Sequence, residues 1–472
     1  MKSNMFKRLS QIRTLAAACL LTAGTSGVAQ SESATDEAEA AASGPDTSEW
    51  LCQNCPVFDG LTGSILFGAG YVSDDFFDFG NYRGLEEQGV FGTFGIDLLY
   101  RDADARYLGV YGEKLGLDSR TLLIEGGRQS RYDAWLEYDE IAHFRSEDTR
   151  TIFLGAGTAN QELPADWVRG DTTAGMTRLD TSLRGIDIKQ DRKTLRLGFS
   201  ALGLSGLGFN ARKEDPWRYR LEVERTKRDG HLIRGASFIF RAAELAAPID
   251  YETTQFDAAV GFVQDRWELE LAYNLSLFDN SNRSVRWQNP FLGIFDADVG
   301  ELAEPPDNRF HQFMLSGSWR QSRWLALAGQ VAVGRMEQDE QFLAPSLNAR
   351  FSSVDLPRSA LDGEVNMRIV NLRATSNLTR HLSARLRFHY DERDNDTDRD
   401  PFVQVVSDTF LTDERTNEPF SFERTSVKGE LDYRFTSFLR LSASAERKKM
   451  ERDFQEVRDA ETDIYTAGAR LN

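Results

Sequence analysis

The pair Cys52 and Cys55 is the arrangement of residues in this sequence with the most evident reactive potential. Two thiols separated by two residues can form a disulfide, exchange disulfides, or supply half of a tetrahedral zinc site. Residue 56 is proline rather than histidine, and no CxxCH occurs elsewhere, so the chain binds no c-type haem covalently. We predict a small disulfide loop between Cys52 and Cys55, with a redox or assembly role as the alternative.

Other catalytic or metal-binding patterns are sparse. The five histidines are scattered, and the sequence contains no GxSxG, HExxH or phosphate-binding loop. Residues 391–400 form the densest acidic run, and carboxylate oxygens suit calcium, but the run lacks the glycine and terminal glutamate of an EF-hand loop. We predict a solvated extracellular loop there, with calcium binding as the alternative. The sequence therefore favours a protein that is not an enzyme and has no catalytic, metal or cofactor residues of its own.

Residues 1–29 have the features of an export signal. Four basic residues precede a short apolar core at 15–23, and small residues at 27–29 precede Gln30. The core is too short to cross a membrane. Removing the signal would change the formal net charge from −18 to −22, because it contains four basic and no acidic residues. So acidic a chain is not expected to bind nucleic acid.

Residues 30–60 are expected to form a disordered periplasmic leader that carries the CxxC, because their first twenty positions are rich in Ser, Ala, Thr, Asp and Glu. The only cysteines after the signal are Cys52 and Cys55, so the exported chain does not rest on a disulfide scaffold. No later stretch approaches the roughly 18 apolar residues of a membrane-spanning helix.

From about residue 61 onward, apolar and polar residues alternate with the period of a β-strand. The clearest segments, each of about 10 residues, start at Leu382, Trp267 and Leu325. A tilted strand needs about that length to cross a bilayer. Short polar turns fall near residues 101–104, 126–130, 213–216, 264–266, 320–323, 379–380 and 436–437. Long connections cover residues 73–90, 145–192, 279–307, 337–364 and 391–423.

Alternation of short turns with long connections is typical of outer-membrane barrels, in which the short turns are periplasmic. We predict an all-β fold over residues 61–472: a transmembrane antiparallel up-and-down β-barrel with about 16 strands present and a periplasmic N-terminus. Its last strand either pairs with the first to close the barrel, or the chain is an incomplete piece of a larger barrel. We therefore expect the protein to lie in the outer membrane of a Gram-negative cell, in contact with its lipid.

Two sets of side chains should mark the surfaces of this barrel. Aromatic residues beside the short turns would form the periplasmic girdle, although aromatics favour any strand: Trp217, Trp267, Trp319, Trp324, Phe435 and Phe438. Charged residues at alternating positions would face the lumen: Arg218, Arg220, Glu222, Glu224, Arg385 and Arg387. So many charged side chains are costly to place against lipid or in a narrow dry core. They therefore predict a wide lumen filled by water or by a polar guest.

The order of several short segments resembles the MtrB/PioB family of decahaem-associated outer-membrane proteins. The segments follow the CxxC at residues 68–75 (GAGYVSDD), 100–102 (YRD), 107–110 (YLGV), 132–138 (YDAWLEY) and 163–167 (LPADW). The resemblance is strongest over residues 50–200 and rests beyond them on the strand and loop pattern.

This resemblance implies a sheath around a periplasmic decahaem c-type cytochrome. The cytochrome would carry all the haem, electrons would pass along its haem chain, and the barrel would insulate it from lipid for extracellular electron transfer. An extracellular multihaem cytochrome is a further implied partner. The residues alone leave open the alternative of a passive porin with a water-filled lumen.

Overall fold

The computed structural model describes residues 59–203, 215–293, 296–322 and 324–471. The predicted signal at 1–29 and nearly all of the leader at 30–60, with Cys52 and Cys55, lie outside the described residues. The predictions made for them therefore stay predictions.

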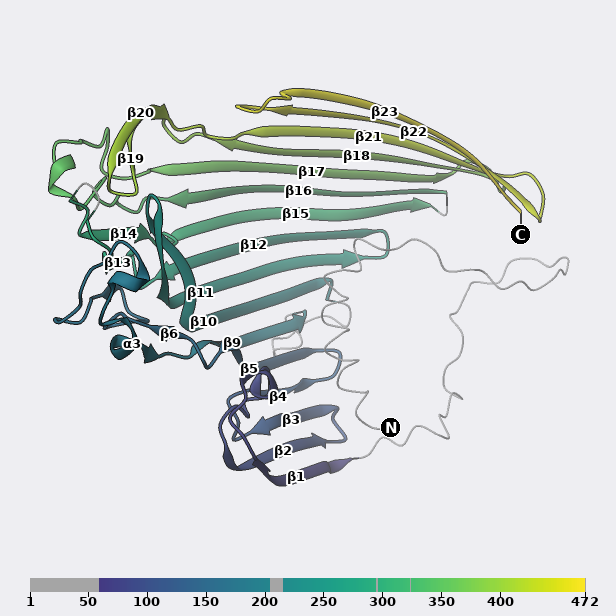
Figure 1. The fold of residues 1–472 in the computed structure, drawn as a ribbon. Coiled ribbons are helices and arrows are strands. Elements are labelled where there is room, and N and C mark those ends of the chain that lie inside the picture. Colours follow the sequence, from purple (N-terminus) through teal and green to yellow (C-terminus); the bar gives the residue numbers. More distant parts are fainter. Residues whose placement is uncertain (1–58, 204–214, 294–295, 323, 472) are drawn as a thin grey trace, which may run out of the picture. The chain divides into compact units, whose positions relative to one another are not determined.

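One antiparallel sheet of 16 strands dominates the described chain (Figure 1). Strands that are neighbours in the sheet follow one another along the chain, so the topology is up-and-down and the predicted count of about 16 is confirmed. The strands are β1 (Gly60–Val72), β2 (Gly89–Arg101), β3 (Arg106–Leu115), β4 (Arg120–Arg128), β5 (Tyr132–Ser146), β9 (Ile188–Leu202), β10 (Trp217–Phe238), β11 (Arg241–Gln264), β12 (Trp267–Asn280), β15 (Asn308–Ser322), β16 (Leu325–Gln338), β17 (Gly363–Asn377), β18 (Leu382–Asn395), β21 (Phe422–Arg434), β22 (Leu439–Arg452) and β23 (Asp459–Leu471).

The two outermost strands of this sheet are β1 and β23. Each pairs with one neighbour, and no ladder joins them in the part of the chain that the structure describes. The pairing of last with first strand, one of the two outcomes expected from the sequence, is therefore not formed, and the sheet is open (Figure 1).

The strand register gives the sheet one apolar face. Residues directly opposite in antiparallel strands project to the same side. One such row runs Leu136, Leu197, Val223, Phe256 and Leu275 across five strands. Large apolar side chains of this face are half-exposed, among them Leu271 at 55% and Leu386 at 53%. An apolar surface this extensive is stable against the hydrocarbon of a membrane rather than against water.

Aromatic side chains gather where this face meets the short turns. Trp267 and Trp319 stack across β12 and β15 with ring centroids 5.6 Å apart, and Trp217 packs edge-on against Phe262 at 5.1 Å. Trp324, Phe435 and Phe438 are exposed beside two further turns. The six predicted girdle residues thus lie at the same end of the strands, where amphipathic rings suit a membrane interface.

Some connections differ from those expected. Strand β4 continues to Arg128, so the turn predicted at residues 126–130 starts later. At the end of the sheet that carries the long connections, β10 and β11 are joined by a tight turn. The strands themselves are long, with 22 and 24 residues. Their hairpin therefore extends well beyond the apolar band, because strands of about 10 residues suffice to cross a bilayer.

The long connections carry small elements of their own. Strands β7 (Asn160–Gln161), β13 (Ser284–Gln288) and β14 (Val299–Ala303) form one sheet, β19 (Pro401–Val406) pairs with β20 (Phe410–Thr416), and β6 (Arg150–Thr151) pairs with β8 (Arg184–Gly185). The helices are α2 (Phe77–Gly80), α3 (Leu179–Ser182) and 3₁₀ turns at Thr173–Gly175 and Ala349–Phe351. None of the helices in the described ranges has the length and apolar character to cross a membrane.

The end of the β10–β11 hairpin and two of these connections share a small hydrophobic core. Its buried members are Phe153, Ala236, Phe238, Leu245, Ala247, Val285, Trp287 and Ala297. The rings of Phe238 and Trp287 lie 5.7 Å apart. The loops at this end are thus partly folded as a unit that packs on the hairpin, a feature that the sequence analysis did not anticipate.

The acidic run at residues 391–400 is only partly a loop. Asp391 to Asn395 belong to β18, which corrects the expectation of a loop throughout, and the buried Asp391 pairs with Arg424 at 2.7 Å. No group of three or more His, Cys, Asp or Glu side chains placed to hold a metal ion occurs among the described residues.

The loop asymmetry leads to a prediction on orientation. Asp398, in a long connection, is 88% exposed, and Arg380 lies exposed in a short turn at the opposite end of β18. In a background with Cys52 and Cys55 replaced by Ser, Asp398→Cys should react with an impermeant maleimide on intact cells, whereas Arg380→Cys should react only after detergent lysis. The reverse pattern would overturn the assigned orientation.

Candidate functional site

The six charged residues predicted to face the lumen share one face of the sheet. On β10, Arg218, Arg220, Glu222 and Glu224 alternate with the apolar row that includes Val223. On β18, Arg385 and Arg387 flank Leu386, which belongs to the apolar face. Because successive residues of a strand project to opposite sides, all six lie on the face that turns away from the membrane, the inward face.

Two of the inward charges of β10, Arg220 and Glu224, take part in ion pairs with other strands. The guanidinium of Arg196 donates from Nε to Glu224 Oε2 at 2.5 Å and lies 3.5 Å from Glu137 Oε1. Arg220 Nη2 is 3.7 Å from Glu270 Oε1. These contacts join β5, β9, β10 and β12, and Arg196, Glu137 and Glu270 were not singled out from the sequence.

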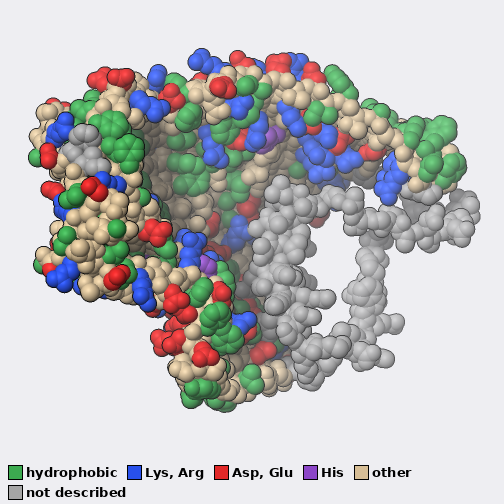
Figure 2. Space-filling model, in the orientation of Figure 1, with side chains coloured by type: hydrophobic (Ala, Val, Ile, Leu, Met, Phe, Trp, Pro, Cys, Tyr) green, Lys and Arg blue, Asp and Glu red, His purple; other side chains and the backbone are tan. Residues whose placement is uncertain are grey.

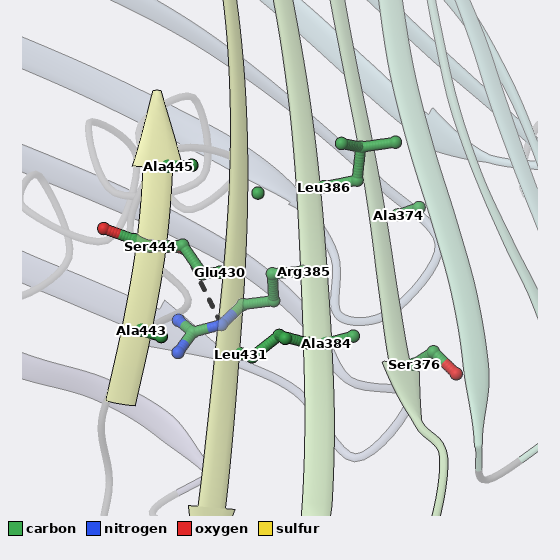
Figure 3. Close-up of a pocket in the computed structure, with 11 residues that line it drawn as sticks. Ala374, Ser376, Ala384, Arg385, Leu386, Glu430, Leu431, Ala443, Ser444 and Ala445 are labelled. Atoms are coloured by element: carbon green, nitrogen blue, oxygen red, sulfur yellow. Dashed lines mark ion pairs between the residues drawn. The ribbon is translucent and has the colours of Figure 1, made fainter. Parts of the chain in front are cut away.

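A second cluster joins β18 to β21. Arg385 donates from Nη2 to Asp432 Oδ2 at 2.5 Å, and Arg387 from Nη2 to Glu430 Oε2 at 2.9 Å. Lys428 Nζ approaches the other oxygen of Glu430 at 3.2 Å. Figure 3 shows the Arg385 side chain reaching across β21 toward Glu430, whose Oε2 lies 3.8 Å from Arg385 Nε, while Leu386 extends away from this ion pair.

The exposure of these pairs indicates what surrounds them. The Arg385, Arg387 and Arg220 side chains are 34%, 46% and 44% exposed. Pairs this exposed contribute about 0–1 kcal/mol each to stability, so folding alone does not account for so many charges on one face. The arrangement instead provides a wetted, charged wall that can hold water or contact a polar guest.

A hollow of about 520 Å³ on the other side of this region belongs to the apolar face (Figure 3). Small residues of four strands, Ala374, Ala384, Gly429, Ala443 and Ala445, leave this space beside Leu386 and Leu431. Ser376, Arg385, Glu430 and Ser444 complete its lining.

One buried charge lies outside the membrane band. Glu304, directly after β14, has a fully buried side chain; Arg234 of β10 donates to its Oε2 at 2.9 Å, and the Tyr251 hydroxyl lies 3.5 Å away. Its other oxygen is buried without a hydrogen-bond partner among the described residues. Burial raises the pKa of Glu304, and Arg234 opposes that shift. This contact links the 281–307 connection to the β10–β11 hairpin.

Comparison with known proteins agrees with this architecture. The sequence matches the family of outer membrane beta-barrel porins MtrB/PioB over residues 71–472. It is 27% identical over 426 residues to outer membrane protein MtrB of Shewanella baltica, a match that covers 90% of this chain and 59% of that protein.

Among solved structures, OmpT of Vibrio cholerae (TM-score 0.30, 9% identity) is matched over 87% of this chain and 95% of its own. The yersiniabactin receptor FyuA of Yersinia pestis (TM-score 0.38, 9% identity) is matched over 88% and 59%.

Proposed function

Because the chain belongs to the MtrB/PioB family of outer-membrane β-barrels, we propose that it forms part of the wall of a sheath around a periplasmic multihaem c-type cytochrome. The assembly conducts electrons across the outer membrane of a Gram-negative cell for extracellular electron transfer. The family is one of porin-like barrels and not of enzymes. The cytochrome carries the haem, and an extracellular multihaem cytochrome is a further partner of this proposal.

The observation that carries the proposal is the inward face with its many charges of both signs. A water-filled channel needs only enough polar surface to stay wet and to select ions. Arg385 and Arg387 are 34% and 46% exposed, while their partners Asp432 and Glu430 are 23% and 19% exposed, so the arginines can instead exchange these carboxylates for those of a protein guest. The chain spans 59% of the length of the MtrB relative, so the proposal concerns the wall to which this sequence contributes.

The proposal predicts a stable complex that contains haem. Protein purified gently from its native outer membrane should co-elute with a multihaem cytochrome and show c-type haem absorbance. In liposomes, electron transfer from an external donor to an enclosed acceptor should require both proteins, because neither a barrel without haem nor a free cytochrome provides a path across the bilayer.

Liposomes with either protein alone are the control. Haem-free purification from cells that make the cytochrome, together with steady ion conductance in planar bilayers, would favour the passive porin.

A further inference from the structure

The charges on the inward face are unevenly distributed around the sheet. Across β17, β18, β21, β22 and β23, the register places eleven Lys or Arg side chains on this face and only four acids, Asp391, Glu430, Asp432 and Glu446. Across β1 to β5 it places six acids and one arginine there. The inward positions of β15 and β16 carry a single charge, Arg320, next to the short turn between these strands. One side of the wall is therefore basic although the whole chain is acidic, and Figure 2 shows Lys and Arg gathered along the underside of the uppermost strands.

Some of these basic side chains oppose one another directly. Arg440 of β22 lies between Arg434 of β21 and Arg470 of β23 in one row of the register. In the described part of the chain, none of the three takes part in an ion pair. Like charges directly opposite each other destabilise a sheet. The arginine row formed by Arg434, Arg440 and Arg470 therefore has excess positive charge that the described wall does not neutralise.

The arginine row lies at the end of the sheet that carries the short turns. Arg434 and Arg440 flank the short turn between β21 and β22, and Arg470 of β23 pairs with Arg440 at the same end of the sheet. Short turns are periplasmic in the orientation assigned above. The row therefore lies at the periplasmic mouth, where a guest from the periplasm enters.

We propose that the inward face of β17–β23 docks an acidic protein surface, and that the arginine row is its contact at the periplasmic mouth. This inference rests on the proposed function for the identity of the guest. Arginine binds carboxylates through paired hydrogen bonds, and a multihaem protein can present both acidic side chains and haem propionates. The acidic face of β1–β5 repels the same surface, so the two sides together select one orientation of the guest.

The test reverses the row in the full chain with R434E, R440E and R470E. The control variant, R447E with K449E, reverses two basic side chains of β22 on the opposite face. Two readouts are compared in detergent: the cytochrome that co-purifies from native cells, and the affinity for a fluorescent poly-glutamate peptide by anisotropy. Heat-modifiable migration on gels verifies that each variant folds. If the charge-reversal variant does not fold, the triple variant R434Q, R440Q and R470Q provides a milder change.

We expect the row variants to lose at least roughly tenfold in both readouts, because like charges then face each other across the interface, while the control keeps both. Unchanged cytochrome recovery and unchanged peptide affinity in a folded row variant would overturn the docking surface. If the unaltered protein recovers no cytochrome but binds poly-glutamate through the row, the docking surface stands and the proposed function fails.

Discussion

Replacing Leu386 with arginine should lower the stability of the inserted sheet by roughly 2–4 kcal/mol, the range for a basic side chain near the bilayer midplane. Leu386 is the third of five outward positions on β18 that start at Leu382 and end at Tyr390, so it lies near the centre of the apolar band. Its side chain is 53% exposed in the isolated chain and therefore meets lipid. The change can be measured as the shift in urea-induced unfolding in lipid vesicles.

The matched control is Arg387→Leu, one residue further along the same strand. It removes one contact to Glu430, but Arg385 and Lys428 remain close to that carboxylate. We expect a loss below about 1 kcal/mol, the usual value of an exposed pair. Equal effects of the two substitutions would mean that the faces of β18 are assigned the wrong way round.

The second large effect is expected outside the membrane. Arg234→Met should destabilise the packing of the 281–307 connection on the β10–β11 hairpin by about 3 kcal/mol, because it leaves the buried carboxylate of Glu304 without its cation. We choose the low end of the range for broken buried pairs since Arg234 is itself 31% exposed. Hydrogen exchange of the β13 and β14 amides reports this local opening directly.

The effect should depend on pH in a defined direction. The pKa of Glu304 is raised in the folded state. The packing of the 281–307 connection on the hairpin is therefore more stable at low pH, and it loses stability as the pH rises and the Glu304 carboxylate ionises. Loss of Arg234 raises that pKa further, so the defect should be larger at pH 8 than at pH 4. Adding Glu304→Gln removes the charge and should abolish most of this pH dependence. A defect that is the same at both pH values would exclude Glu304 as its cause.

Local patterns in the sequence were sufficient to predict the membrane sheet. Leu382, Leu386 and Phe388 alternate with polar neighbours, and a period of two assigns each residue to a face without any knowledge of its partners. The strand count and the up-and-down order follow from such segments and from the turns between them. The faces of Arg218 and Arg387 follow in the same way.

Features that depend on distant partners could not be read in this way. The contact between Arg196 and Glu137 joins strands separated by a long connection, and the row of Arg434, Arg440 and Arg470 appears only once the register is fixed. A slip of one residue would move a side chain to the other face. The small core around Phe238 and Trp287 likewise unites segments that, taken separately, resemble ordinary loops.

That small core changes how the outward end of the protein should respond to proteases. Loop tips are normally where a folded chain is nicked first, because their backbone can enter a protease active site with little unfolding. Here only Phe240 in the turn of the hairpin is highly exposed, at 90%, whereas Phe238, Leu245 and Ala247 are at most 2% exposed, so cleavage beside these three first requires loss of the core. Susceptible bonds are instead those of the small β19–β20 hairpin, since every residue of β20 is exposed. The surface presented to the outside of the cell thus combines a protease-resistant projection with connections that are readily cut.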